Sequence, residues 1–159
     1  MTVVHNANNT GSLDHFPVSR DGVVLCSHAH GSTTVVTATG EIDASNIHHL
    51  TDYTTHLLGA ARPVVIDLAE LDFLSAQGIS ELFDFDERCG AAGVQWALVP
   101  SHPVRRLLRI CDLDGRLPVA ESTDDALERF SSPSRIRPLL QVVSETGQRS
   151  RQQARDMHL

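Results

Sequence analysis

The chain has 159 residues, of which 41% are hydrophobic, and its formal net charge is −7. This length suits one domain with a core of ordinary size, and no apolar run is long enough for a membrane-spanning helix. The negative charge argues against nucleic acid as a partner, and the polar start does not look like a signal peptide. We therefore expect a cytoplasmic protein without membrane association.

The first third of the chain predicts an arm, a hairpin and a helix. Residues 1–21 lack an apolar period and are expected to be a flexible arm. Short strands are predicted at 23–26 and 34–38, joined by a glycine-containing turn as in an antiparallel hairpin. Asp43 or Ser45 is expected to cap the helix that follows, since a short side-chain oxygen satisfies free amides of the first turn. The apolar face of that helix comprises Ile47, Leu50, Thr54, Leu57 and Leu58.

The middle of the chain predicts a buried strand and a second helix. Residues 63–68 are rich in β-branched residues without polar alternation, which indicates a central strand parallel to a neighbour. Residues 71–78 are expected to form the turn into the helix. Its inward stripe is expected to comprise Ile79, Leu82, Phe83, Asp86 and Cys89, with Phe85 beside it.

The last elements continue the alternation. A strand is predicted at 94–99, then a helix capped by Ser101, with an apolar stripe of Val104, Leu107, Leu108 and Cys111. Residues 117–120 contain a proline and suit only a sheet edge. Ser122 or Thr123 then caps a last helix. Alternation of this kind predicts an α/β sheet with right-handed crossovers.

The charge balance reverses after residue 130. Residues 131–159 hold five arginines against two acids, whereas residues 1–130 hold eight arginines against 18 acids. We expect residues 132–159 to be an extension outside the domain, disordered or marginally helical.

Three segments share the order and spacing of a known family: GEID at 40–43, VVIDL at 64–68 and LDFLSAQGI at 71–79. Together they resemble the STAS domain of anti-sigma factor antagonists, over residues 22–131. The resemblance implies a mixed sheet of four to five strands with helices packed on one face. It also implies partner switching, in which the antagonist binds an anti-sigma factor, usually a histidine-kinase-like serine kinase, and so releases a sigma factor.

The resemblance places a phosphorylation site at the turn before the second helix. That turn commonly reads Asp-Ser-Ser-Gly in the family, and phosphate on its first serine breaks the complex. Here Ala76 stands at the acceptor position, so the usual off-switch is missing. Ser75 is expected to be a helix cap, with a substitute phosphosite as the alternative. The expected partner surface comprises Asp43, Ser45, Ser75, Ala76, Gln77, Gly78 and Ser80.

Other polar clusters carry weaker signals. The acids of the second helix, Glu81, Asp84, Asp86 and Glu87, indicate a solvated face or a patch that steers a basic partner. The pairs His28 and His30, and His49 and His56, are interpreted as surface histidines, and neither a metal nor another cofactor is expected.

Two cysteines and one alternative function remain open. Cys89 and Cys111 are predicted on the inward stripes of consecutive helices, as reduced core thiols or, alternatively, as a redox pair. The chain has no GxSxG, HExxH, Walker or GxGxxG motif, so we expect no enzymatic activity. The alternative function is a scaffold or sensor without a sigma-linked partner, which assembles as a homodimer or with other STAS proteins.

Overall fold

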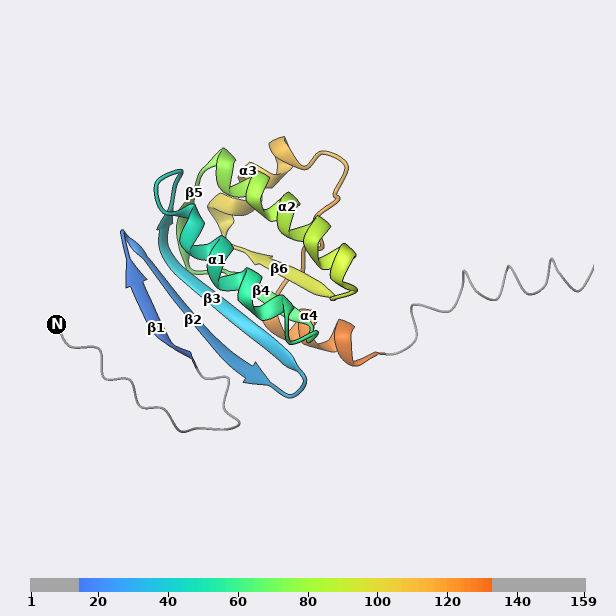
Figure 1. Ribbon diagram of the computed structural model, residues 1–159. Coiled ribbons are helices and arrows are strands. Elements are labelled where there is room, and N and C mark those ends of the chain that lie inside the picture. The colour runs from blue at the N-terminus through green and yellow to red at the C-terminus, as the bar shows by residue number, and fades with distance from the viewer. Residues whose placement is uncertain (1–14, 133–159) are drawn as a thin grey trace, which may run out of the picture.

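The computed structural model describes residues 15–132 of the chain (Figure 1). In chain order its elements are β1 (His15–Arg20), β2 (Val23–His30), β3 (Thr33–Ile42), α1 (Ile47–Leu58), β4 (Val64–Leu68), β5 (Leu71–Leu74), α2 (Ala76–Ala92), β6 (Trp96–Pro100), α3 (His102–Cys111) and α4 (Thr123–Ser131). Within the described residues, no helix is both long and apolar enough to cross a bilayer.

One mixed sheet organises the fold. Its strand order is β1-β2-β3-β4-β6, and β5 pairs with the end of β3. The β1–β2 and β2–β3 pairs are antiparallel, and β4 lies parallel to both β3 and β6. The predicted α/β class, the hairpin and the central parallel strand are therefore confirmed. The sheet has six strands instead of the expected four to five.

The two additional strands lie where no strand was expected. β1 occupies residues 15–20 of the segment that was predicted to be a flexible arm, and it pairs with β2 through Val18 opposite Leu25. β5 occupies the segment that was predicted to be a turn, with Leu74 opposite Ile42 of β3. Both strands are short, at six and four residues, so pairing with a longer strand determines them more than their own pattern does. The rest of the predicted arm, and the predicted extension from residue 133, lie outside the described residues.

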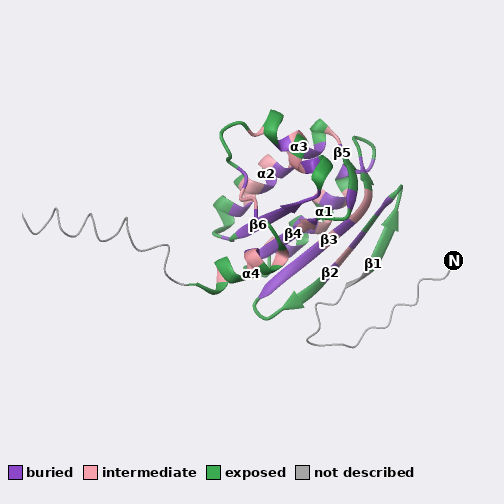
Figure 2. Cartoon of the chain, turned by 180° about the vertical axis from the view of Figure 1, so that it is seen from behind, coloured by how far each residue is buried: buried purple, intermediate pink, exposed green. Residues whose placement is uncertain are grey.

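The helices cover both faces of the sheet. α1, α2 and α3 pack on the face that presents Val36, Ile66 and Leu98. α4 packs on the other face, where Ala126 joins a smaller core cluster with Val35 and Val65. The expectation that all helices lie on one face is therefore wrong for α4. The reason is visible in β4 and β6, which are buried on both sides and need a cover on each (Figure 2).

Residues 117–120 bring the chain from one face to the other. They make a single parallel bridge, Leu98 with Val119, at the outer edge of β6. Leu98 donates its amide to the carbonyl of Pro118 (2.9 Å) and accepts from the amide of Ala120 (2.8 Å). The predicted edge position is confirmed, although the contact is limited to one bridge.

Helical periodicity placed most of the α2 core correctly. The inward residues are Ile79, Leu82, Phe85 and Cys89, so Phe85 takes the central position that was assigned to Phe83. Phe83 is partly buried at the edge of the core. Asp86 accepts a hydrogen bond from the indole nitrogen of Trp96 (2.9 Å), whose ring meets Phe85 edge-on. The half-buried carboxylate of Asp86, which interrupts the apolar stripe of α2, therefore has a hydrogen-bond partner.

The side chain of Asn46 ties three segments together just before α1. It is 3% exposed. Its amide nitrogen donates to the carbonyls of Asp21 (2.8 Å) and Glu41 (2.9 Å), and its oxygen accepts from the amide of Asp43 (2.9 Å). The turn after β3 is thus fixed to the turn between β1 and β2.

We predict that Asn46→Ala lowers the free energy of unfolding by about 2–3 kcal/mol, because three partly buried backbone groups lose their hydrogen-bond partner. Asn46→Asp keeps the size but loses both donors, and it should destabilise the fold at least as much. Chemical denaturation monitored by circular dichroism measures both changes. A loss below about 0.5 kcal/mol for both variants would mean that water replaces the side chain without cost.

Candidate functional site

Two parallel strands end side by side and create the candidate site. Ile42 ends β3 opposite Leu74, which ends β5, and the amide of Ser75 donates to the carbonyl of Ile42 (2.9 Å). Residues that follow parallel strands share one edge of the sheet, where ligands of α/β folds commonly bind. We call this region the strand-end surface; its exposed or partly exposed residues are Asp43, Ser45, Ser75, Ala76, Gln77 and Ser80.

Ser75 is the N-cap of α2, as predicted. Its backbone is extended, and its hydroxyl oxygen accepts a hydrogen bond from the amide of Gly78 (3.1 Å). Ala76 and Gln77 follow in the exposed first turn. The hydroxyl of Ser80 donates back to the carbonyl of Ala76 (3.4 Å). The start of α2 therefore offers solvent a helix end with partial positive charge and small side chains.

Asp43 organises the neighbouring turn. One of its carboxylate oxygens accepts from the hydroxyl (2.6 Å) and from the amide (2.8 Å) of Ser45. These hydrogen bonds hold the pKa of Asp43 below its ordinary value, so the carboxylate is charged at neutral pH. The expectation that Asp43 or Ser45 caps α1 is wrong: Asn46 is the N-cap residue, and no side chain bonds to the first helical amides there. The Asp43 carboxylate instead shapes the turn before the helix.

Gly78 is not part of the surface. It is buried in the first turn of α2, where a Cβ atom would collide with Cδ1 and Cγ of Leu74. Gly78 was expected on the partner surface, and its burial does not fit that expectation. The missing side chain instead lets α2 approach β5, and this close packing positions Ser75 and Gln77.

The two cysteines lie in different environments. Cys89 is buried, whereas Cys111 is exposed at the end of α3, so the predicted inward position of Cys111 is wrong. Burial raises the pKa of the Cys89 thiol to about 12, and the nearby Asp86 carboxylate adds to the rise. Since the thiolate is the reactive form in disulfide exchange, Cys89 suits the role of a reduced core thiol. The geometry lends no support to a redox pair.

The acids of α2 are mostly engaged within the fold. Glu81 accepts from the hydroxyl of Thr51 (3.0 Å). Asp86 and Glu87 form ion pairs with Arg116, at 3.7 Å and 3.0 Å. The carboxylate of Asp84 alone among the four makes no such contact with another described residue. These pairings favour a solvated, structural face over a patch that steers a basic partner.

The histidines do not converge. His49 lies 3.0 Å from a carboxylate oxygen of Asp21, and His56 lies 2.6 Å from the carbonyl of Asp52. His28 and His30 are exposed on β2. Among residues 15–132, no three histidine, cysteine or acidic side chains are grouped so that they could hold a metal ion.

Two glycines of α2 provide a matched test of the packing. We predict that Gly78→Ala lowers the melting temperature, since overpacking against Leu74 costs about 1–3 kcal/mol. Gly90→Ala in the same helix meets open space and should stabilise the protein by about 0.5–1 kcal/mol. Scanning calorimetry distinguishes the two. If both variants were stabilised, α2 would not depend on close contact with β5.

Comparison with known proteins places this arrangement in a family. The family model of the STAS domain matches residues 27–126. Osmosensory protein A of Mycobacterium tuberculosis is 40% identical over 114 residues, which cover 69% of this chain and 72% of that protein. Anti-sigma-F factor antagonist RsfA of the same species is 35% identical over 126 residues, 77% of this chain and 97% of that protein.

A solved structure agrees with these relatives. The crystal structure of an anti-sigma factor antagonist from Mycobacterium paratuberculosis superimposes with a TM-score of 0.65 at 26% identity. The superposition covers 72% of this chain and 98% of that one. The residues that match the family model include the whole strand-end surface, and the chain belongs to the STAS domain family.

Proposed function

We propose that this protein is an anti-sigma factor antagonist, and that it binds its anti-sigma factor through the strand-end surface. Its relatives include a protein named as an anti-sigma-F factor antagonist, and the structure from M. paratuberculosis carries a similar name. The observation that carries the proposal is the pairing of Ile42 with Leu74. It sets two exposed turns side by side at one edge of the sheet.

The strand-end surface suits protein recognition because it is held in place before a partner arrives. The side chain of Asn46 is hydrogen-bonded to the backbone of Asp43 and of Glu41 and so fixes this turn. The amide of Ser75 donates to the carbonyl of Ile42 in β3. A surface that is already ordered loses little conformational entropy on binding. The Asp43 carboxylate and the helix end of α2 present opposite charges to a partner, which favours one orientation over others.

The proposed partner is an anti-sigma factor of the serine-kinase type, and the proposed outcome is release of a sigma factor. Ala76 has no hydroxyl at the position that the family resemblance assigns to the phosphoryl acceptor. The hydroxyl oxygen of Ser75 already bonds to the amide of Gly78. A misplacement of about 1 Å can slow transfer on the order of a hundredfold, and one residue shifts the chain by about 3.8 Å. Binding is therefore proposed to persist without a phosphorylation switch at this turn.

The surface is tested by one substitution at two glutamines. Gln77 is exposed on the strand-end surface, whereas Gln95 is exposed before β6, at the opposite edge of the parallel strands. We predict that Gln77→Arg weakens binding to the anti-sigma factor at least tenfold, about 1.4 kcal/mol, and that Gln95→Arg leaves it unchanged. Isothermal titration calorimetry with purified anti-sigma factors of the source genome measures both. Equal affinities for the two variants would remove the strand-end surface from consideration.

The missing acceptor is tested by restoring it. With an anti-sigma kinase and ATP, we predict no phosphate at residues 75–80 of the wild type, and phosphorylation with loss of binding in the Ala76→Ser variant. Mass spectrometry locates the phosphate, and Ala91→Ser, which adds a hydroxyl at the far end of α2, is the control. Stoichiometric phosphate on Ser75 or Ser80 of the wild type, with partner release, would contradict the proposal.

A second function has one specific observation in its favour. The relative at 40% identity is named Osmosensory protein A, which fits a sensor or scaffold without a sigma-linked partner. Purification from native cells separates the two functions. Co-purification of a histidine-kinase-like ATPase supports the antagonist, whereas a homodimer or a larger assembly of STAS proteins alone supports the scaffold.

A further inference from the structure

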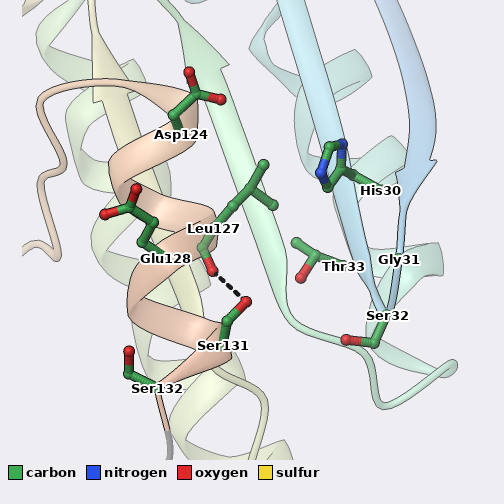
Figure 3. A pocket seen from close by; sticks show the side chains of 9 residues that line it. All are labelled: His30, Gly31, Ser32, Thr33, Asp124, Leu127, Glu128, Ser131 and Ser132. Carbon is green, nitrogen blue, oxygen red and sulfur yellow. Dashed lines mark hydrogen bonds between the residues drawn. The ribbon is translucent and has the colours of Figure 1, made fainter.

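A pocket of about 750 Å³ lies between the tip of the β2–β3 hairpin and α4 (Figure 3). The hydroxyl of Ser131 donates to the carbonyl of Leu127 (3.0 Å) within α4, and no buried side-chain nitrogen or oxygen among the described residues lacks a hydrogen-bond partner. The pocket therefore calls for no ligand. The end of α3 differs, because exposed apolar side chains and unpaired charges occur there together.

The two most exposed large hydrophobic side chains among the described residues are three positions apart. Ile110 in the last turn of α3 is 73% exposed, and Leu113 in the loop that follows is 83% exposed. Single exposed apolar residues are normal on a protein surface, but two so close in the chain form a small patch. We call this region the α3 corner; its residues, all exposed, are Arg106, Arg109, Ile110, Cys111, Leu113 and Asp114.

The loop that carries Leu113 is held in place. Both carboxylate oxygens of Asp112 accept hydrogen bonds, from the amides of Arg116 (2.8 Å) and Leu117 (3.0 Å), and Leu117 is buried. The guanidinium group of Arg116 forms ion pairs with two acids of α2, at 3.7 Å and 3.0 Å. The exposure of Leu113 is thus built into the fold, and a partner that covers this side chain has little loop to order.

Unpaired charges flank the apolar pair along the chain. Arg106 and Arg109 precede it and Asp114 follows it, and none of the three forms an ion pair or side-chain hydrogen bond with another described residue. The neighbouring Arg105, in contrast, forms an ion pair with Glu121 (3.2 Å). Because the unpaired charges have both signs, a purely acidic partner would be repelled by Asp114 and a purely basic partner by the two arginines. A second copy of the same surface carries both signs.

We propose that the α3 corner is a contact between two copies of this chain that are related by a two-fold axis. In such a contact the same patch of each copy meets the other in the opposite direction. Ile110 and Leu113 then face the same two residues of the second copy. The arginines of each copy face Asp114 of the other, so opposite charges are matched. The α3 corner shares no residue with the strand-end surface, and the dimer is therefore independent of anti-sigma factor binding.

Sedimentation velocity of the full chain tests the proposal. Few apolar side chains are buried in this contact, so we expect a weak dimer, and the sedimentation coefficient should rise between about 10 µM and 1 mM protein. Leu113→Asp should weaken the dimer by about tenfold or more, because it places a carboxylate in the apolar contact. Val24→Asp changes an apolar side chain that is 36% exposed on β2, and it should leave self-association unchanged.

An exchange of charges identifies the second copy as the partner. Asp114→Arg alone and Arg106→Glu/Arg109→Glu alone should each weaken self-association, because like charges then face each other across the axis. An equimolar mixture of these two variants should associate again, since each variant supplies the charge that the other needs. A mixture that associates no better than either variant alone would contradict the two-fold contact.

Cys111 reports the contact chemically. It is exposed, whereas Cys89 is buried and Cys26 is half-buried. A short bismaleimide should link two chains of the wild type, and Cys111→Ser should abolish the link. A sedimentation coefficient that stays constant up to about 1 mM protein would overturn the proposal. A dimer that persists in Leu113→Asp and in both charge variants, with circular dichroism showing them to be folded, would overturn it as well.

Discussion

β3 is hydrogen-bonded along both edges, and the position of the candidate site follows from this. One edge pairs with β2 along most of its length. The other edge is shared, because β4 pairs with its first half and β5 with its end. The change of partner occurs near Gly40, which has a φ of +95° and where a Cβ atom would collide with the carbonyl oxygen of Gly22. A residue without a side chain is required there.

From this arrangement comes a strand-end surface that is made of turns. The turn of Asp43 and the first turn of α2 leave the sheet at the same edge, and neither depends on a large side chain for its shape. Short polar side chains and backbone bonds hold both turns, so the outer side chains can vary without changing the fold.

The fold was largely predictable because its strongest signals are local. β4 and the caps Ser75, Ser101 and Ser122 were all read correctly from local sequence. β1 and β5 were missed because such short segments become strands only by pairing with β2 and β3. The position of α4 was missed because periodicity shows that a helix has a buried face but not which side of a sheet it covers.

Individual site residues were harder to predict, for reasons of packing. Cys111 fits the helical repeat, but α3 ends there and the residue is exposed. Gly78 belongs to the right turn, yet whether a glycine faces a partner or a neighbouring strand depends on tertiary distance. Asn46 was not identified, since its three partners are backbone groups. No residue type in the sequence marks those groups in advance.

The single tryptophan of the chain has an optical consequence. Trp96 is 6% exposed, beside Phe85 and bonded to Asp86. It begins β6, at the opposite edge of the parallel strands from Ser75. Indole emission shifts to longer wavelength as water reaches the ring, so the intrinsic fluorescence of this protein reports the integrity of its core. A spectral change on addition of a partner that binds at the strand-end surface would therefore signal a rearrangement inside the domain, because the indole lies away from that surface.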